Sequence, residues 1–465
     1  MNMINVRRLT VMTFLGAGML SGISAQVSPL QVDTLKETKI PDQWDLQSCI
    51  DYAKEQNITI RKNRITAAST QIDVKTAKAA LFPSLSFSTS QQVVNRPYQE
   101  TSSRVSGSEI ISSNSKTSYN GNYGLNASWT LYNGNKRLKT IQQEKLNNQV
   151  AELDVATSEN NIQESIAQVY IQILYAAESV KVNESTLQVS IAQRDRGQEL
   201  LNAGSIAKSD FAQLEAQVST DRYQLVTAQA TLEDYKLQLK QLLELDGENE
   251  MNIYLPALSD ENVLAPLPTK KDVYISALSL RPEIEASKLN VEASELGIGI
   301  AKSSYLPTIS LSAGIGTNHT SGSDFTFGEQ VKNGWNNSIG LSVSVPIFNN
   351  RQTKSAVQKA KLQYETSMLS LLDEQKTLYK TIEGLWLDAN SAQQRYAAAN
   401  EKLKSTQISY ELISEQFNLG MKNTIELLTE KNNLLQAQQE QLQAKYMAIL
   451  NTQLLKFYQG DQLAL

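Results

Sequence analysis

An internal duplication is the feature of this sequence that most constrains its fold. Gly124–Ser128 (GLNAS) returns as Gly340–Ser344 (GLSVS), and Leu201–Gly204 (LNAG) returns as Phe417–Gly420 (FNLG). Both pairs are about 216 residues apart, because 340 − 124 and 420 − 204 give the same difference. So long a period indicates the duplication of a large unit rather than a short solenoid repeat. We expect each copy to contain a helix, two strands, a very long helix, a turn and a second long helix.

The duplication sets the expected boundaries of the segments. Residues 44–244 are predicted to form the first repeat and residues 272–458 the second. A linker that contains prolines and a glycine spans residues 245–271 between them. Short tails are expected at 26–43 and 459–465.

Residues 1–25 have the pattern of a secretory signal peptide. Arg7 and Arg8 precede an apolar stretch from Leu9 to Leu20, and small residues lead to an expected cleavage site after Ala25. A membrane-anchor helix is the alternative, but the stretch is shorter than the ~20 apolar residues that such a helix needs. We therefore expect an exported protein without a helical membrane span.

The composition argues against several classes of function. The formal net charge of −5 gives no support for nucleic-acid binding. His319 is the one histidine and Cys49 the one cysteine, so neither a Cys/His metal site nor a His-based triad is expected. We predict no catalytic residue, no cofactor and no metal site, and we expect Cys49 to be a small core residue.

Period-two alternation predicts four strands, at about 84–92, 120–131, 308–317 and 336–346. Their apolar positions alternate with serine, asparagine and glycine, and no charged residue interrupts the polar phase. An apolar face opposite a small uncharged one is typical of a strand between lipid and water. A half-buried strand of a soluble sandwich has the same period and is the alternative. The residues expected to face lipid are Leu125, Trp129, Leu311 and Leu341.

Long helices are expected before and after the strands. One helix is predicted from about Trp44 to Leu81, and a Ser/Asn-rich connection is expected at about 93–118. Residues 134–203 contain no proline, and about 70 residues at 1.5 Å each would make a rod of about 105 Å. In the returning helix, apolar residues at three- and four-residue steps predict an antiparallel coiled coil. These residues include Phe211, Leu214, Val218 and Leu225.

The predicted strands require several copies of the chain. Four strands cannot close a barrel, and open sheet edges are not tolerated in lipid. Three chains would supply about twelve strands, which is within the range of outer-membrane barrels. The expected fold is mainly α with a small membrane β part. Long antiparallel coiled-coil helices form an α-barrel, and four strands per protomer contribute to a trimeric β-barrel of about twelve strands, with internal duplication.

The duplicated order of these features resembles the TolC family of outer-membrane efflux channels. The resemblance covers about residues 44–458 and includes the strand exits Tyr132–Gly134 and Phe348–Asn350. It implies a homotrimer in the cell outer membrane whose helical tunnel extends into the periplasm. The implied partners are outer-membrane lipid, a periplasmic adaptor (membrane fusion) protein and an inner-membrane RND or ABC transporter, with no nucleic acid.

The resemblance also implies roles for the two helix–turn–helix tips, at about 202–210 and 418–426. Carried over by position, the residues expected to line a periplasmic gate are Ser209, Asp210, Phe417, Lys422, Glu426 and Thr429. Thr429 departs from the acidic residue often found there in the family. A solvated capping role is the alternative, because Ser209, Asp210 and Glu426 suit the first turn of a helix.

The turns themselves are the expected adaptor-docking ends. Gly204 and Gly420 are predicted to adopt the left-handed conformation that ends each long helix, with Ser205 and Met421 beside them. The function expected from the resemblance is that of a passive trimeric duct in a tripartite efflux or type I secretion system, and not that of an enzyme. An exported coiled-coil structural or adhesive surface protein is the main alternative, and an exported hydrolase is a third.

Overall fold

The computed structural model describes residues 41–98, 102–106, 109–113, 116–246, 251–256, 263–321, 323 and 325–463. The predicted signal peptide and most of the tail that follows it lie outside the described residues. All elements below belong to the second of two units, Asp42–Leu465. Among the described residues, no helix is both long enough and apolar enough to cross a membrane.

The duplication is visible in the lengths of the helices that precede the strands. Helices α2 (Leu46–Gln56) and α3 (Ile58–Ala79) contain 11 and 22 residues, and so do α6 (Lys270–Leu280) and α7 (Pro282–Ser303). The prediction of one continuous helix from Trp44 to Leu81 was therefore wrong. The helix breaks at Asn57, whose side chain accepts a hydrogen bond from the N–H of Thr59 at 2.9 Å. An asparagine in this capping role stabilises a new helix start.

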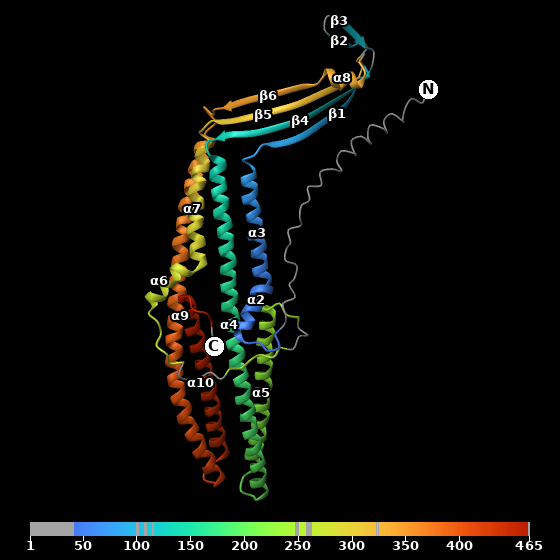
Figure 1. Cartoon of the computed structure of the whole chain (residues 1–465). Helices are drawn as coiled ribbons and strands as arrows, with labels where there is room; N and C mark the ends of the chain where they lie inside the picture. Colours follow the sequence, from blue (N-terminus) through green and yellow to red (C-terminus); the bar gives the residue numbers. More distant parts are fainter. Residues whose placement is uncertain are drawn as a thin grey trace, which may run out of the picture. The chain divides into compact units, whose positions relative to one another are not determined.

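Two long helical hairpins form most of the structure (Figure 1). Helix α4 (Lys136–Asn202) pairs with α5 (Lys208–Leu242), and α9 (Gln352–Asn418) pairs with α10 (Thr424–Gln459). Helices α4 and α9 each contain 67 residues. At 1.5 Å per residue, each is about 100 Å long. The absence of proline within these helices leaves their hydrogen-bond ladders unbroken.

A four-stranded antiparallel sheet continues from the helices, as predicted. Its order is β1 (Ser84–Asn95), β4 (Thr117–Asn133), β5 (Thr308–Thr320) and β6 (Asn336–Ser344). One strand pair from each repeat thus joins the same sheet, with β4 next to β5 in the middle. Strands β1 and β6 are its two edges.

Three short elements were not predicted. The Ser/Asn-rich connection contains a second antiparallel hairpin, β2 (Ser102–Ser106) with β3 (Glu109–Ser113). A short helix, α8 (Phe327–Asn333), lies between β5 and β6. Thr326 and Glu329 cap its start reciprocally, which explains why so short a helix forms there.

The main hydrophobic core lies where the two repeats meet, about halfway along the long helices. It brings together side chains of α2, α4 and α10, with Cys49, Tyr170 and Leu454 among its buried members. Cys49 is fully buried, which confirms its prediction as a core residue, and burial raises the pKa of its thiol to about 12. The linker adds to this region, because Ile253 forms a parallel β-bridge with Trp44.

Candidate functional site at the helix ends

Both helical hairpins turn through the same backbone motif. Gly204 has φ +74° and Gly420 has φ +73°, which confirms the predicted left-handed conformation. In each turn, the N–H of the next residue bonds to the carbonyl five residues earlier, at 2.8 Å from Ser205 and 2.9 Å from Met421. This pairing satisfies carbonyls that the end of a helix leaves free. All four residues are exposed.

The first tip holds Asp210 in a capping role. Its carboxylate accepts a hydrogen bond from the N–H of Ala207 at 3.3 Å, within the first turn of α5. Ser209 is exposed beside it. Both side chains therefore lie at the start of the returning helix, where a negative charge and side-chain oxygens are favourable.

The second tip contains an ion pair. The ammonium group of Lys422 lies 2.6 Å from a carboxylate oxygen of Glu426, and both side chains are partly exposed. The other oxygen of Glu426 accepts from the N–H of Asn423 at 3.1 Å, and Asn423 caps the N–H of Glu426 in return. The hydrogen bonds from Lys422 and Asn423 hold the pKa of Glu426 below its ordinary value of 4.5.

The other two predicted gate positions of the second tip differ in exposure. Phe417 is buried at 5% exposure within the single chain. Thr429 is exposed, and its hydroxyl donates to the carbonyl of Ile425 at 2.8 Å. Of the six predicted gate residues, the structure thus brings only Lys422 and Glu426 into side-chain contact through a hydrogen bond or an ion pair.

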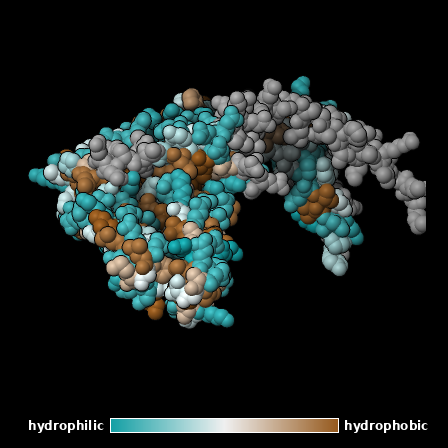
Figure 2. Space-filling view, turned by 90° about the horizontal axis from the view of Figure 1, so that it is seen from below, coloured by the Kyte–Doolittle hydropathy of each residue, from teal (hydrophilic) through white to brown (hydrophobic). Residues whose placement is uncertain are grey.

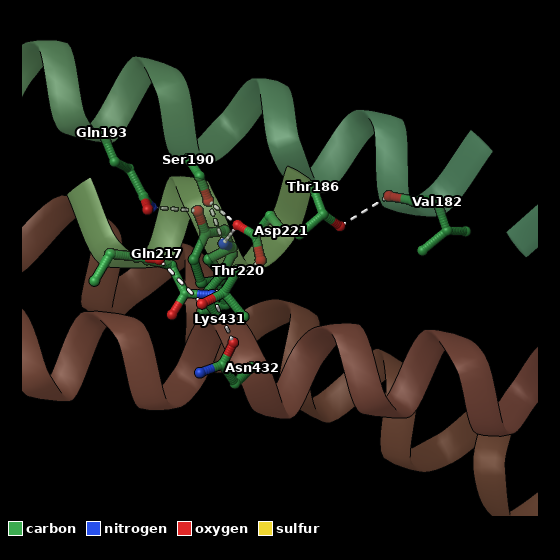
Figure 3. Close-up of polar contacts among 11 residues, drawn as sticks. Val182, Thr186, Ser190, Gln193, Gln217, Thr220, Asp221, Lys431 and Asn432 are labelled. Carbon is green, nitrogen blue, oxygen red and sulfur yellow. Dashed lines mark hydrogen bonds and ion pairs between the residues drawn. The ribbon is translucent and has the colours of Figure 1, made fainter. Parts of the chain in front are cut away.

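A buried polar cluster joins the two hairpins and was not predicted (Figure 3). We call it the clamp and define it as Ser190 of α4, Asp221 of α5 and Lys431 of α10. The ammonium group of Lys431 donates to the Asp221 carboxylate and to the Ser190 hydroxyl, and that hydroxyl donates to the same carboxylate oxygen. The side chains of Lys431 and Asp221 are only 3% and 2% exposed. A buried pair of opposite charges is thus one direct polar link between the first hairpin and the second.

Neighbouring amides extend the clamp. The amide nitrogen of Gln217 donates to Asp221 at 2.9 Å and to Asn432 at 3.3 Å, which adds a second link between α5 and α10. Further along, Gln193 of α4 donates to the hydroxyl of Tyr410 in α9 at 2.8 Å. Burial lowers the pKa of Lys431, and the hydrogen bond and charge of Asp221 oppose that shift.

The clamp lies close to the tips. Lys431 follows Thr424, the first residue of α10, by seven residues (431 − 424), which corresponds to about 10 Å of helix. A hollow of about 340 Å³ adjoins it between α4, α9 and α10, with Thr186, Tyr410 and Leu434 among its lining residues. The clamp is therefore placed to fix how the two hairpins sit against each other near their ends.

A sequence signal for the clamp was present. The apolar series of the returning helix moves from Val218 to Leu225 and leaves out Asp221, which is the position where the three- and four-residue steps require an apolar side chain. Lys431 interrupts a similar series between Leu427 and Leu434. Opposite charges on these two apolar stripes indicate a buried pair, although the sequence does not show which charges meet.

The predicted lipid-facing residues lie on one face of the sheet. Trp129 is opposite Leu311 in the register, and Leu311 is opposite Leu341, so the three form one row across three strands. Leu125 lies four residues from Trp129 on the same strand and therefore on the same face. Leu341 is 64% exposed. Among the described residues, no group of three or more His, Cys, Asp or Glu side chains is arranged to hold a metal ion.

Comparison with known sequences identifies similar proteins. The family model described as "Outer membrane efflux protein" matches residues 49–244 and 273–460. The outer membrane efflux protein BepC of Brucella suis is 24% identical over 63% of this chain and 61% of its own length. The outer membrane protein TolC of Escherichia coli is 23% identical over 65% of this chain and 62% of its own length. The matches thus span about three fifths of the length of these relatives.

Solved structures share the fold. A crystal structure of CusC, described in connection with folding and transmembrane channel formation, superposes with a TM-score of 0.76 at 19% identity over 90% of this chain and 92% of the CusC chain. The Campylobacter jejuni CmeC outer membrane channel gives a TM-score of 0.73 at 18% identity, with 90% and 87% coverage. At these identities the likeness concerns the fold alone.

Proposed function

Because the chain belongs to the outer membrane efflux protein family, we propose that it is the passive outer-membrane channel of a tripartite efflux or type I secretion system. Family membership locates it in the cell outer membrane, with its helices extending into the periplasm. Its relatives include an alkaline protease secretion protein and an antibiotic efflux pump outer membrane protein. The single observation that carries the proposal is the joining of one four-stranded sheet to two ~100 Å helical hairpins.

The open sheet edges support a homotrimer. Strands β1 and β6 are edges, and a lipid-exposed edge leaves backbone groups without hydrogen bonds. Three copies close this sheet into a barrel of about twelve strands, with the serine and asparagine face toward a water-filled lumen. Each protomer then contributes its two repeats, 44–244 and 272–458, to equivalent places around the ring.

The helices offer surfaces suited to a neighbouring protomer. On α3, Ile58, Ile65 and Ile72 are exposed at intervals of seven residues, and on α9 Leu362 and Leu369 have the same spacing. Such a spacing is that of a coiled-coil seam. Viewed from the helical ends, hydrophobic patches lie among hydrophilic side chains on the helical part (Figure 2). Burial of these stripes between protomers would complete an α-helical tunnel.

The tips are the proposed docking and gating region. Gly204, Ser205, Gly420 and Met421 lie at the ends of the hairpins remote from the strands, where a periplasmic adaptor would connect them to an inner-membrane RND or ABC pump. The gate residues proposed for the closed trimer are Ser209, Asp210, Phe417, Lys422, Glu426 and Thr429. Within one protomer, Lys422 pairs with Glu426, so a contact between Lys422 and Asp210 of neighbouring tips would compete with that pair.

The sheet assignment is tested by two adjacent arginine variants. Leu341→Arg places a charge on the proposed lipid face, where the cost falls from about 2–4 kcal/mol at mid-membrane to about 0–1 kcal/mol near the interfaces, whereas Ser342→Arg places it toward the lumen. We expect Leu341→Arg to reduce the yield of assembled trimer on semi-native gels. Ser342→Arg should assemble normally and change single-channel conductance in planar bilayers. Equal behaviour of the two variants, or a wild-type protein that is a soluble monomer, would contradict the proposal.

The gate is tested by reversing one charge. Lys422→Glu removes the ion pair of the second tip and repels Asp210, so we expect higher single-channel conductance with unchanged trimer yield. Lys404→Glu, on the exposed surface of α9, is the matched control and should conduct like the wild type. Raising the salt concentration should reproduce part of the increase in the wild type, because salt screens exposed pairs.

The pH dependence of conductance tests whether the Lys422–Glu426 ion pair contributes to closing the gate. Glu426 has a lowered pKa, so its contribution to tip stability is present above its ordinary value of 4.5 and is lost as pH falls through the lowered value. Wild-type conductance should therefore stay constant from about pH 7 to 5 and rise only below that range. If Lys422→Glu leaves conductance unchanged, the packing of Phe417 and its neighbours, rather than charge, closes the entrance.

A further inference from the structure

The connection between β5 and β6 exposes three large aromatic side chains. Phe325, Phe327 and Trp335 are 54%, 46% and 57% exposed, although they flank or belong to the seven-residue helix α8. The helix lies at the end of the sheet farthest from the long helices (Figure 1). Large exposed aromatic residues gathered in one short segment indicate a surface that contacts something apolar.

Helix α8 is held against the apolar side of the sheet. The hydroxyl of Thr317 donates to the carbonyl of Val331 at 2.7 Å, and the ring of His319 meets that of Phe327 with centroids 5.1 Å apart. Thr317 and His319 have the same side-chain phase as Leu311, because alternate residues of a strand point to the same face. The connection therefore folds over the outside of the proposed barrel and not over its lumen.

The ring of His319 packs between the tyrosines of β4 and Phe327 of α8. Its ring stacks near Tyr123 (5.8 Å, 21°) and lies 5.1 Å from Tyr119, and it is only 7% exposed. Gly121 leaves room for it, since a Cβ there would lie 2.2 Å from the imidazole Cε1 atom. Neither ring nitrogen has a hydrogen-bond partner among the described residues. The described contacts of this ring are therefore aromatic contacts and not hydrogen bonds.

The distance between the aromatic groups on β4 matches the height of the apolar band of an outer-membrane barrel. Tyr119 and Trp129 are 10 residues apart (129 − 119), which is about 33 Å along the strand. At a strand tilt of about 40°, this corresponds to about 25 Å of height, the thickness of the apolar band of outer-membrane barrels. Trp129, whose indole N–H donates to the carbonyl of Leu81 at 2.7 Å, marks the helical end of that band. The aromatic cluster around His319 and α8 marks the other end.

We propose that Phe325, Phe327 and Trp335 dock into the boundary between lipid headgroups and acyl chains in the outer leaflet, with α8 as a membrane-interface helix on the outside of the barrel. The proposal rests on the proposed membrane function of the sheet. Aromatic rings are favoured at this boundary, and the exposed Glu329 and Lys332 suit the polar headgroup layer. One consequence is that this connection leaves the external mouth of the channel uncovered.

Depth-dependent fluorescence quenching tests the docking. Single cysteines are introduced at Phe325→Cys and Trp335→Cys in a Cys49→Ser background, labelled with an environment-sensitive dye and reconstituted into phosphatidylcholine vesicles. Asn318→Cys is the matched control, because it lies beside His319 on the opposite, polar face of β5. Leu341→Cys reports on the apolar face of the sheet itself. Quenching by lipids spin-labelled near the headgroup is compared with quenching by aqueous iodide.

We expect at least twofold stronger quenching by the shallow spin label at Phe325 and Trp335 than at Asn318, and weak quenching by iodide. Quenching no stronger than at Asn318, with Leu341 still quenched by lipid, would overturn the docking of α8 but leave the channel intact. Protection from both quenchers at Phe325 and Trp335 would also overturn it and would assign the surface to a second copy of the chain. Absence of lipid quenching at Leu341 would contradict the membrane position of the whole sheet.

Discussion

Replacing Asp221 with alanine is expected to lower the free energy of unfolding by about 3–5 kcal/mol, because it leaves the ammonium group of Lys431 buried without its counter-ion. The side chain of Lys431 is 3% exposed, so its ammonium group has little contact with bulk water. Thermal and denaturant unfolding of the detergent-solubilised trimer, followed by circular dichroism, measures the change. Asp195→Ala, at an exposed position of α4, is the matched control and should change stability by less than about 0.5 kcal/mol.

The double variant Asp221→Leu/Lys431→Met tests whether the loss of stability comes from the buried charge that Asp221→Ala leaves without a partner. Apolar residues of similar volume remove both charges, and such replacements are often neutral or stabilising. We expect this variant to recover most of the stability lost in Asp221→Ala. A loss below about 1 kcal/mol in the single variant, or a double variant as unstable as the single one, would show that the clamp is not an isolated buried pair.

The same double variant addresses what the clamp does for the channel. A buried ion pair costs desolvation, so its benefit here is to select one arrangement of α5 against α10 over its alternatives. Without it, the polar links between the hairpins near the tips are reduced to single hydrogen bonds such as those from Gln217 to Asn432 and from Gln193 to Tyr410. We therefore expect the double variant to keep its trimer yield but to show more frequent changes of conductance level in planar bilayers. Constant single-level conductance would show that other contacts between the hairpins are sufficient to fix their arrangement.

The sequence was sufficient to predict the elements whose pattern repeats along the chain. Two-residue alternation predicted the strands, and the absence of proline predicted the 67-residue helices, because both signals are local. The turns at Gly204 and Gly420 were predictable for the same reason, since a left-handed residue at a helix end favours glycine.

The features that were missed depend on contacts between distant segments. The clamp joins residues that are 31, 210 and 241 positions apart, and no local pattern pairs Lys431 with Asp221 rather than with another carboxylate. The break at Asn57 was missed because asparagine has only a moderate cost inside a helix. Helix α8 has too few residues to show a helical period of hydrophobicity, and its position depends on a contact between Phe327 and His319 of β5.

Arg281 is the second buried charge whose removal should have a large effect. It lies between α6 and α7 at 6% exposure and donates to Glu164 of α4 at 3.1 and 3.2 Å and to Glu283 at 2.7 Å. Its guanidinium also lies over the ring of Tyr458 in α10, 4.2 Å from the centroid. One cation thus connects the second repeat to the first at the level of the core.

Arg281→Met is expected to destabilise the protein by about 3–5 kcal/mol at neutral pH, because it leaves two carboxylates close together without a counter-ion. Burial already raises the pKa of Glu164 above its ordinary value of 4.5, against the opposing charge of Arg281. Without Arg281 that pKa rises further, so the folded state binds more protons than the unfolded state, and stability increases as the pH falls. The deficit should therefore be larger at pH 8 than at pH 5.

Glu164→Gln, which keeps the Arg281–Glu283 pair, is the control and should lose less than about 1 kcal/mol. An equal deficit at both pH values would show that Arg281 acts by packing against Tyr458 and not by its charge.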